Sequence, residues 1–154
     1  MQTSLFTGMP ERYVASHRPD VPILFFNPVK LRHRLDLFRK GFPGLVTYAV
    51  KANDTPEVVE NLSMAGLRTF DVASPAEIMR VRGLCPDATL HYNNPVRSTC
   101  EIQAGIQAGI ASWSVDCISE LEKLIENRVA GEIAVRLHLP IGGSAYNFGE
   151  KFGA

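Results

Sequence analysis

The sequence predicts an α/β fold in which repeated strand–helix units build a parallel sheet. From Leu45 onward, short runs rich in β-branched and aromatic residues alternate with amphipathic stretches of helical periodicity. The starts of successive runs lie about 20 to 24 residues apart, roughly the length of a minimal strand, helix and two loops. Parallel strands joined by helical crossovers account for both observations.

Two further elements are expected ahead of five repeated strands. Residues 21–27 predict a separate strand, and residues 28–40 predict a basic amphipathic helix. We therefore divide the chain into an N-terminal part, residues 1–44, and a repeated part, residues 45–154. The five strands of the repeated part are expected at 45–50, 69–73, 89–93, 112–115 and 132–137, and the glycine-rich residues 140–154 are expected to form a loop.

The expected helices between the strands carry start and stop signals. Each begins after a residue that can cap a helix N-terminus, and two of these caps have the spacing of a capping box. Gly66 and Gly83 are expected to end the first two helices. The capping residues are Thr55 ahead of Pro56, Ser74 with Glu77, Ser98 with Glu101, and Asp116.

The composition excludes several classes of protein. The chain has 154 residues with 16 basic and 16 acidic side chains, so no overall charge attracts nucleic acid or an anionic membrane. The longest nearly uncharged stretch, residues 98–115, is interrupted by glycines and polar residues, which excludes a membrane span there. The first ten residues lack the pattern of a secretory signal, and a cytoplasmic location is therefore expected.

The cysteines do not indicate a metal site or disulfide framework. There are three, an odd number, with no Cys-x-x-Cys pair and no histidine at ligand spacing. They are expected to be reduced and to pack as small apolar side chains.

The number of units leaves two architectures open. Five β/α units are about five-eighths of a closed barrel, which usually needs about 250 residues. The chain is therefore either an open doubly wound sheet or part of a longer barrel. The turn after the first strand, residues 51–54, has no glycine, unlike the phosphate-binding first turn of many open sheets.

Polar side chains follow the expected strands at their carboxyl ends, where both architectures place their sites. Strand alternation would direct Lys51 to the same side as Ala49. A partly desolvated lysine there would lose its proton more readily and could condense with an aldehyde. Asp71 and Arg136, expected at neighbouring strand ends, would supply an anion and a cation. A solvated lysine without a function is the alternative.

Several segments then resemble one family. The run Tyr48-Ala49-Val50-Lys51-Ala52-Asn53 is similar to the lysine motif of the fold-type III pyridoxal phosphate enzymes, the group of ornithine, diaminopimelate and arginine decarboxylases. The resemblance covers about residues 22–154, and its motifs occur in family order. The other matching segments are 70–78, 94–98, 114–116, 135–137 and 151–154.

The resemblance implies a fold and a site. The fold would be a partial (β/α)8 TIM barrel of the alanine-racemase type, with about five of eight units. Pyridoxal 5'-phosphate would be the cofactor, Lys51 its Schiff-base lysine, and Asp71 and Glu77 catalytic carboxylates. Ala49, Asp71 and Arg136 would contact the cofactor. The alternatives are that Glu77 only completes a capping box, that Asp71 is a turn residue, and that Arg136 forms an ion pair within a barrel layer.

Among these enzymes, the chain most resembles the ornithine decarboxylase branch. This implies a cytoplasmic homodimer that converts a small basic amino acid, ornithine, into putrescine and carbon dioxide in polyamine synthesis. The alternatives are a non-catalytic, decarboxylase-like regulatory module, and a diaminopimelate decarboxylase or racemase of the same fold. The family's remaining cofactor-binding groups are expected after residue 154, so these 154 residues alone are expected to be inactive.

The expected half-barrel also leaves surfaces uncovered. Its unpaired edge strands and an apolar inner face would be exposed. We therefore expect dimerisation, or recruitment of residues 21–27 to cover one edge.

Overall fold

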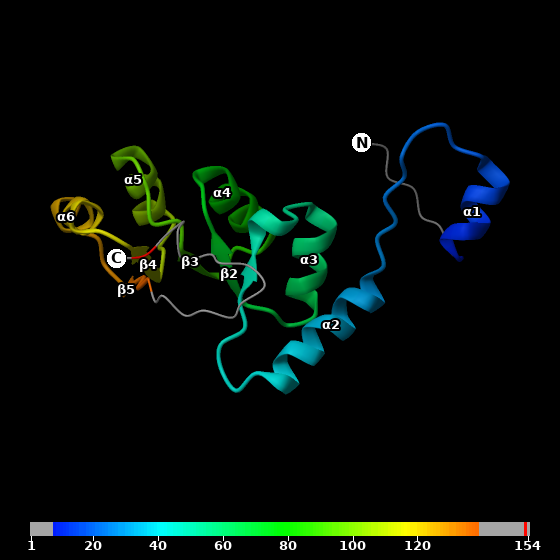
Figure 1. Ribbon diagram of the computed structural model, residues 1–154, viewed down its shortest axis with the longest axis horizontal. Helices are drawn as coiled ribbons and strands as arrows, with labels where there is room; N and C mark the ends of the chain where they lie inside the picture. Colours follow the sequence, from blue (N-terminus) through cyan, green and yellow to red (C-terminus); the bar gives the residue numbers. More distant parts are fainter. Residues whose placement is uncertain (1–7, 139–152, 154) are drawn as a thin grey trace.

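The computed structural model describes residues 8–138 and residue 153 (Figure 1). The loop expected at residues 140–154 and the family motif at 151–154 lie outside this part of the chain, apart from Gly153. The helices are α1 (Pro10–His17), α2 (Pro28–Gly41), η1 (a 3-10 turn, Val50–Ala52), α3 (Pro56–Met64), α4 (Pro75–Leu84), α5 (Thr99–Gln107) and α6 (Ile118–Glu126). The strands are β1 (Tyr48–Ala49), β2 (Thr69–Val72), β3 (Thr89–Tyr92), β4 (Ser112–Val115) and β5 (Glu132–Val135).

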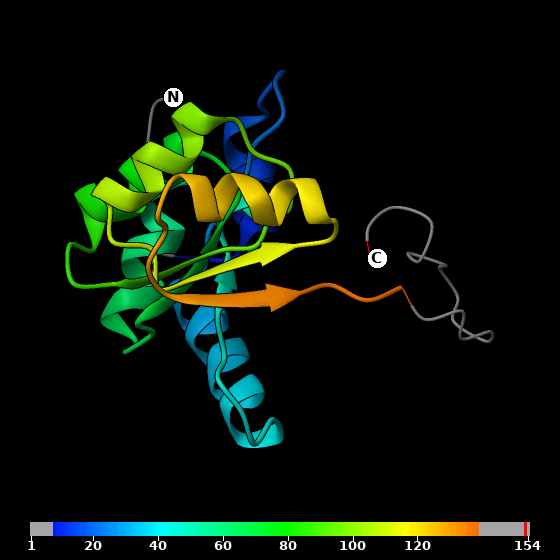
Figure 2. The same cartoon turned by 90° about the vertical axis from the view of Figure 1, so that its left-hand side faces the viewer.

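The five strands form one parallel sheet in the order β1-β2-β3-β4-β5. Because the order never reverses, the sheet is of the barrel type, since a doubly wound sheet has a switch point where the order reverses. Right-handed crossovers of this kind place every helix on the same side, and Figures 1 and 2 show α3 to α6 on one side of the sheet. The predicted α/β fold with five parallel strands is confirmed.

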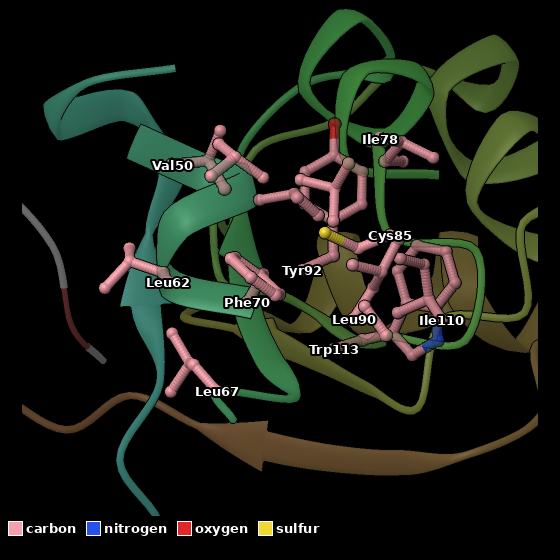
Figure 3. Packing of buried hydrophobic residues seen from close by; sticks show 14 of the residues in the cluster. Val50, Leu62, Leu67, Phe70, Ile78, Cys85, Leu90, Tyr92, Ile110 and Trp113 are labelled. Carbon is pink, nitrogen blue, oxygen red and sulfur yellow. The ribbon is translucent and has the colours of Figure 1, made fainter. Parts of the chain in front are cut away.

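The hydrophobic core lies between the sheet and these helices. Phe70, Leu90 and Tyr92 are fully buried, and Trp113 is 1% exposed; their side chains gather in one cluster (Figure 3). The helices contribute Val59, Leu62, Ile78, Val81, Ile102 and Leu124. The strands therefore direct their apolar residues toward the helices, as alternation requires.

The opposite face of the sheet carries small and polar residues, so the prediction of an apolar inner face was wrong. The register aligns one residue from each strand into a row across the sheet. We call these residues the inner row: Ala49, Asp71, His91, Ser112 and Glu132. Side chains alternate along each strand, and the apolar ones point toward the helices. Small and polar side chains therefore make up the inner row.

The predicted strand at residues 21–27 is absent. This segment has no regular structure, Val21 and Leu24 are 63% and 72% exposed, and it pairs with no edge of the sheet. Pro22 removes one backbone donor, and no strand within residues 8–138 supplies partners for the other backbone groups. The predicted helix α2 does form, and it packs against α3 through buried Leu35 and a hydrogen bond from Arg39 Nη1 to the Ala65 carbonyl (2.9 Å).

The helix signals were confirmed only in part. Ser98 and Glu101 form a reciprocal capping box, and Gly66 follows α3 with a φ of +87°. However, α4 continues through Gly83 to Leu84, and α6 begins after Cys117 rather than Asp116. Thr55 precedes α3 without a side-chain capping bond.

All three cysteines are free; Cys85 is buried as expected, but Cys100 and Cys117 are exposed. Across residues 8–138, none of the helices has the length and apolar character needed to cross a bilayer. The same residues contain no cluster of three or more His, Cys, Asp or Glu side chains that could hold a metal ion.

Candidate cofactor site

The loop that carries Lys51 is held by its own hydrogen bonds. The Tyr48 hydroxyl donates to the Asn53 carbonyl (3.1 Å), and the Asn53 N–H donates to the Val50 carbonyl (3.1 Å). The side-chain oxygen of Asn53 then accepts from the Thr55 N–H (3.1 Å), just before α3. These bonds turn the chain sharply after Ala49, which is why β1 has two residues instead of the expected six.

Lys51 lies in η1, so strand alternation does not direct its side chain as predicted. It is exposed rather than partly desolvated. It is nevertheless close enough to Asp71 for its positive charge to lower the pKa of that carboxyl. The structure thus places the predicted lysine and the predicted carboxylate at adjoining strand ends.

The Asp71 carboxyl has a pKa that its surroundings shift in opposing directions. Burial raises its pKa above the ordinary value, while hydrogen bonding from Asn93 and the charges of Lys51 and His91 oppose the rise. Its Oδ1 atom is buried and has no hydrogen-bond partner in the described part of the chain. A buried carboxylate oxygen without a hydrogen-bond donor destabilises the folded chain. A ligand or a neighbouring donor that binds this oxygen would remove that cost.

Glu77 is held by the backbone at the carboxyl end of β2. Its Oε2 accepts from the Ala73 N–H (2.9 Å), and its own N–H donates to Ser74 Oγ (3.3 Å). Ser74 therefore caps α4, but Glu77 does not complete a capping box, because its carboxylate binds the Ala73 N–H and not the Ser74 N–H. The half-buried carboxylate stays at the strand ends.

Arg136 and Ala49 lie at opposite edges of the sheet. Arg136 directly follows β5, and its N–H donates to the Val115 carbonyl (2.8 Å). Strands β3 and β4 separate it from Asp71, so the prediction that these two residues stand at neighbouring strand ends was wrong. Ala49 has a small side chain and pairs in register with Asp71 on the neighbouring strand.

Sequence reasoning missed two features of this end of the sheet. His91 and Ser112 belong to the inner row, and His91 Nδ1 lies 2.7 Å from Ser112 Oγ. A usable signal was present, because His91 lies between Leu90 and Tyr92, and alternation sends it away from the core.

The second missed feature is Arg97, which is 2% exposed. It donates to the carbonyls of Tyr92 (3.3 Å), Asn94 (2.7 Å) and Ser114 (2.7 Å). Its guanidinium lies over the rings of Tyr92 and Trp113, and burial lowers its pKa. Arg97 therefore ties the loop after β3 to the end of β4, next to Asn93.

These residues fit a pyridoxal group. The aldehyde of pyridoxal condenses with an accessible amine, and exposed Lys51 provides one. A cationic ring or amine is stabilised by a nearby anion, and Asp71 provides a carboxylate with an unpartnered oxygen.

Comparison with protein families decides the identity. Residues 29–154 match the family described as pyridoxal-dependent decarboxylase, pyridoxal binding domain. The chain belongs to this family. The predicted resemblance to fold-type III decarboxylases is confirmed, and so is pyridoxal phosphate as the cofactor of the family.

Relatives of this decarboxylase domain act on several amino acids. It is 29% identical over 89% of its length to a lysine/ornithine decarboxylase of Selenomonas ruminantium, covering 35% of that protein. It is 31% identical over 70% of its length to an ornithine decarboxylase of Mus pahari, covering 23% of it. A diaminopimelate decarboxylase of Vibrio cholerae is 29% identical over 75% of the chain, which covers 28% of that enzyme.

Solved structures agree with this assignment. A lysine/ornithine decarboxylase from Vibrio vulnificus, complexed with putrescine, has a TM-score of 0.76 at 25% identity, with 93% of this chain and 38% of that one covered. A variant of SrLDC in complex with PLP has a TM-score of 0.81 at 25% identity, with 99% of this chain and 40% of that chain covered. The chain thus spans about two-fifths or less of the relatives it matches.

Proposed function

We propose that this domain carries the lysine-bearing part of the cofactor site of a pyridoxal phosphate-dependent amino acid decarboxylase. The observation that supports this most is the proximity of exposed Lys51 to half-buried Asp71, whose Oδ1 has no partner among the described residues, within a domain of this family.

Several residues of the chain would each have a separate role at the cofactor. Pyridoxal phosphate supplies an electron sink for the charge that develops when carbon dioxide leaves. Lys51 Nζ would hold the cofactor, and Asp71 would stabilise positive charge beside it. Glu77, fixed by the Ala73 N–H, would add a second negative charge at the end of β2. Arg136 would contact the cofactor from the β5 edge.

The proposed substrate is a small basic amino acid, with ornithine favoured. Its α-carboxyl group would leave as carbon dioxide and a proton would replace it at the α-carbon, which yields putrescine. The motifs of the ornithine branch favour this substrate, and lysine and diaminopimelate decarboxylases are also among the relatives. Product analysis with the full-length protein tests the choice: putrescine from ornithine supports it, and turnover of diaminopimelate alone contradicts it.

We also propose that the full-length protein acts as a cytoplasmic homodimer. The half-open sheet, with edge strands β1 and β5, favours completion by further protein. Analytical ultracentrifugation of the full-length protein tests the dimer, and a monomer at micromolar concentration contradicts it.

A cofactor titration tests the role of Lys51. The chain is titrated with pyridoxal phosphate, and the visible absorption of the lysine-bound form is followed. Wild type is compared with Lys51→Ala and with the matched control Lys40→Ala, which removes an exposed lysine at the end of α2. The proposal expects saturable binding in wild type and control, and its loss in Lys51→Ala. Equal binding by all three proteins contradicts it.

A further inference from the structure

His91 occupies an unusual position in the inner row. Its Nδ1 lies 2.7 Å from Ser112 Oγ, while its Nε2 is buried and has no hydrogen-bond partner among the described residues. On the neighbouring strand, its register partner Asp71 has a buried Oδ1 that also lacks a partner. One unpartnered nitrogen and one unpartnered carboxylate oxygen thus lie on paired residues of adjacent strands, whose backbones are about 4.8 Å apart.

We propose that His91 is a positioning residue for Asp71, in a relay that runs across three strands from Ser112 through His91 to the Asp71 carboxylate. In this relay the Ser112 hydroxyl would donate to Nδ1, and Nε2–H would donate to Asp71 Oδ1, a bond that the structure itself does not contain. The relay deepens the proposed function, because it fixes the anion that adjoins Lys51, and in that respect it rests on that function.

The direction of the relay follows from donor and acceptor chemistry. A neutral imidazole has one N–H donor and one acceptor nitrogen, and the partner of one nitrogen sets the tautomer. If Nδ1 donated to Ser112, Nε2 would present a lone pair toward a carboxylate, and two acceptors would face each other. With the Ser112 hydroxyl as donor, Nε2 carries the proton and satisfies the carboxylate.

The charged and polar groups around His91 are consistent with this direction. Asp71 lies on β2 and Lys51 in η1, and the charges of Lys51 and His91 both act on the Asp71 carboxyl. Asn93, at the end of β3, hydrogen-bonds to Asp71, and Glu132 lies in the inner row beyond Ser112 on β5. Asn93 and Nε2–H would together fix the orientation of the Asp71 carboxylate, whose negative charge lies near Lys51.

The ionisation of Asp71 tests the relay without any cofactor. The carboxyl carbon of Asp71 is followed by NMR against pH in the 154-residue chain and assigned with Asp71→Asn. In His91→Leu, which removes the donor, the acid ionisation constant of Asp71 is expected to fall about tenfold, which is one pKa unit upward. In His91→Gln, whose amide can still donate, it is expected to stay within about threefold of wild type.

Each outcome is decisive. An unchanged Asp71 titration in His91→Leu overturns the relay. An equal shift in both variants also overturns it, because loss of the imidazole alone and not of a donor would then explain the effect. Urea unfolding of both variants checks that they fold. If the titration behaves as expected but pyridoxal phosphate does not bind at Lys51, the relay stands and the proposed function fails.

Discussion

The packing of Trp113 predicts that Gly105→Ala lowers the free energy of unfolding, although alanine has the higher helix propensity. Gly105 lies buried in α5, and a Cβ there would overlap Cη2 of Trp113 and lie 3.2 Å from Ile110 Cγ1. The indole has little freedom to move, because it stacks on Tyr92 (5.6 Å between ring centroids) and its Nε1 donates to the Ala130 carbonyl (3.3 Å). Gly105→Ala therefore forces overpacking.

Gly83 provides the matched control. It lies within α4 and is exposed, and a Cβ there would meet no atom within 4 Å. Replacing a helix-interior glycine by alanine stabilises by about 0.5–1 kcal/mol, so Gly83→Ala should gain this amount. In Gly105→Ala the same gain is outweighed by overpacking, which costs about 1–3 kcal/mol. We expect Gly83→Ala to be more stable than wild type and Gly105→Ala to be less stable.

Urea unfolding followed by far-UV circular dichroism measures both variants against wild type. The signal reports on all helices and does not depend on the indole, whose surroundings the substitution changes. The reasoning is refuted if Gly105→Ala unfolds at the same or a higher urea concentration than Gly83→Ala.

Two further predictions concern buried polar groups. Burial raises the pKa of Tyr92 to about 12 and its hydroxyl has no partner in the described region, so Tyr92→Phe should leave the free energy of unfolding unchanged or raise it slightly. Tyr48→Phe, which loses the bond to the Asn53 carbonyl, should lower it by about 1 kcal/mol, and equal losses in urea unfolding would contradict this contrast. The pKa of Asp71 is higher in the folded than in the unfolded chain, so its contribution to stability is greatest at acid pH and is lost as the pH rises through the folded value. Asp71→Asn should therefore unfold at a higher urea concentration than wild type at neutral pH. This difference in urea midpoint should disappear below pH about 3.9. A midpoint difference that is larger at acid pH than at neutral pH would contradict the prediction.

The sequence predicted the units of the fold because each unit is specified locally. Strand β4 was predicted with its observed bounds, and the Ser98–Glu101 capping box was confirmed, since both depend on residues a few positions apart. Residues 21–27 are as apolar as a strand, yet strand formation requires a partner elsewhere in the chain. Apolar character alone could not show that this partner is absent.

The site was predicted less completely, for a related reason. Lys51 and Asp71 were identified because Lys51 follows a strand, Asp71 lies near the carboxyl end of the next strand, and each belongs to a family motif. The distance between Arg136 and Asp71 depends on strand order, which a list of strand ends does not contain. The pairing of His91 with Asp71 on adjacent strands depends on register, which becomes known only when the strands are paired.

The central claim is that Lys51 is the residue that holds the cofactor. The most direct test is to incubate the purified chain with pyridoxal phosphate, reduce it with borohydride, and locate the modified lysine by peptide mass mapping. The account predicts modification at Lys51 well above Lys30, Lys40 and Lys123. Modification spread evenly over these lysines would contradict it.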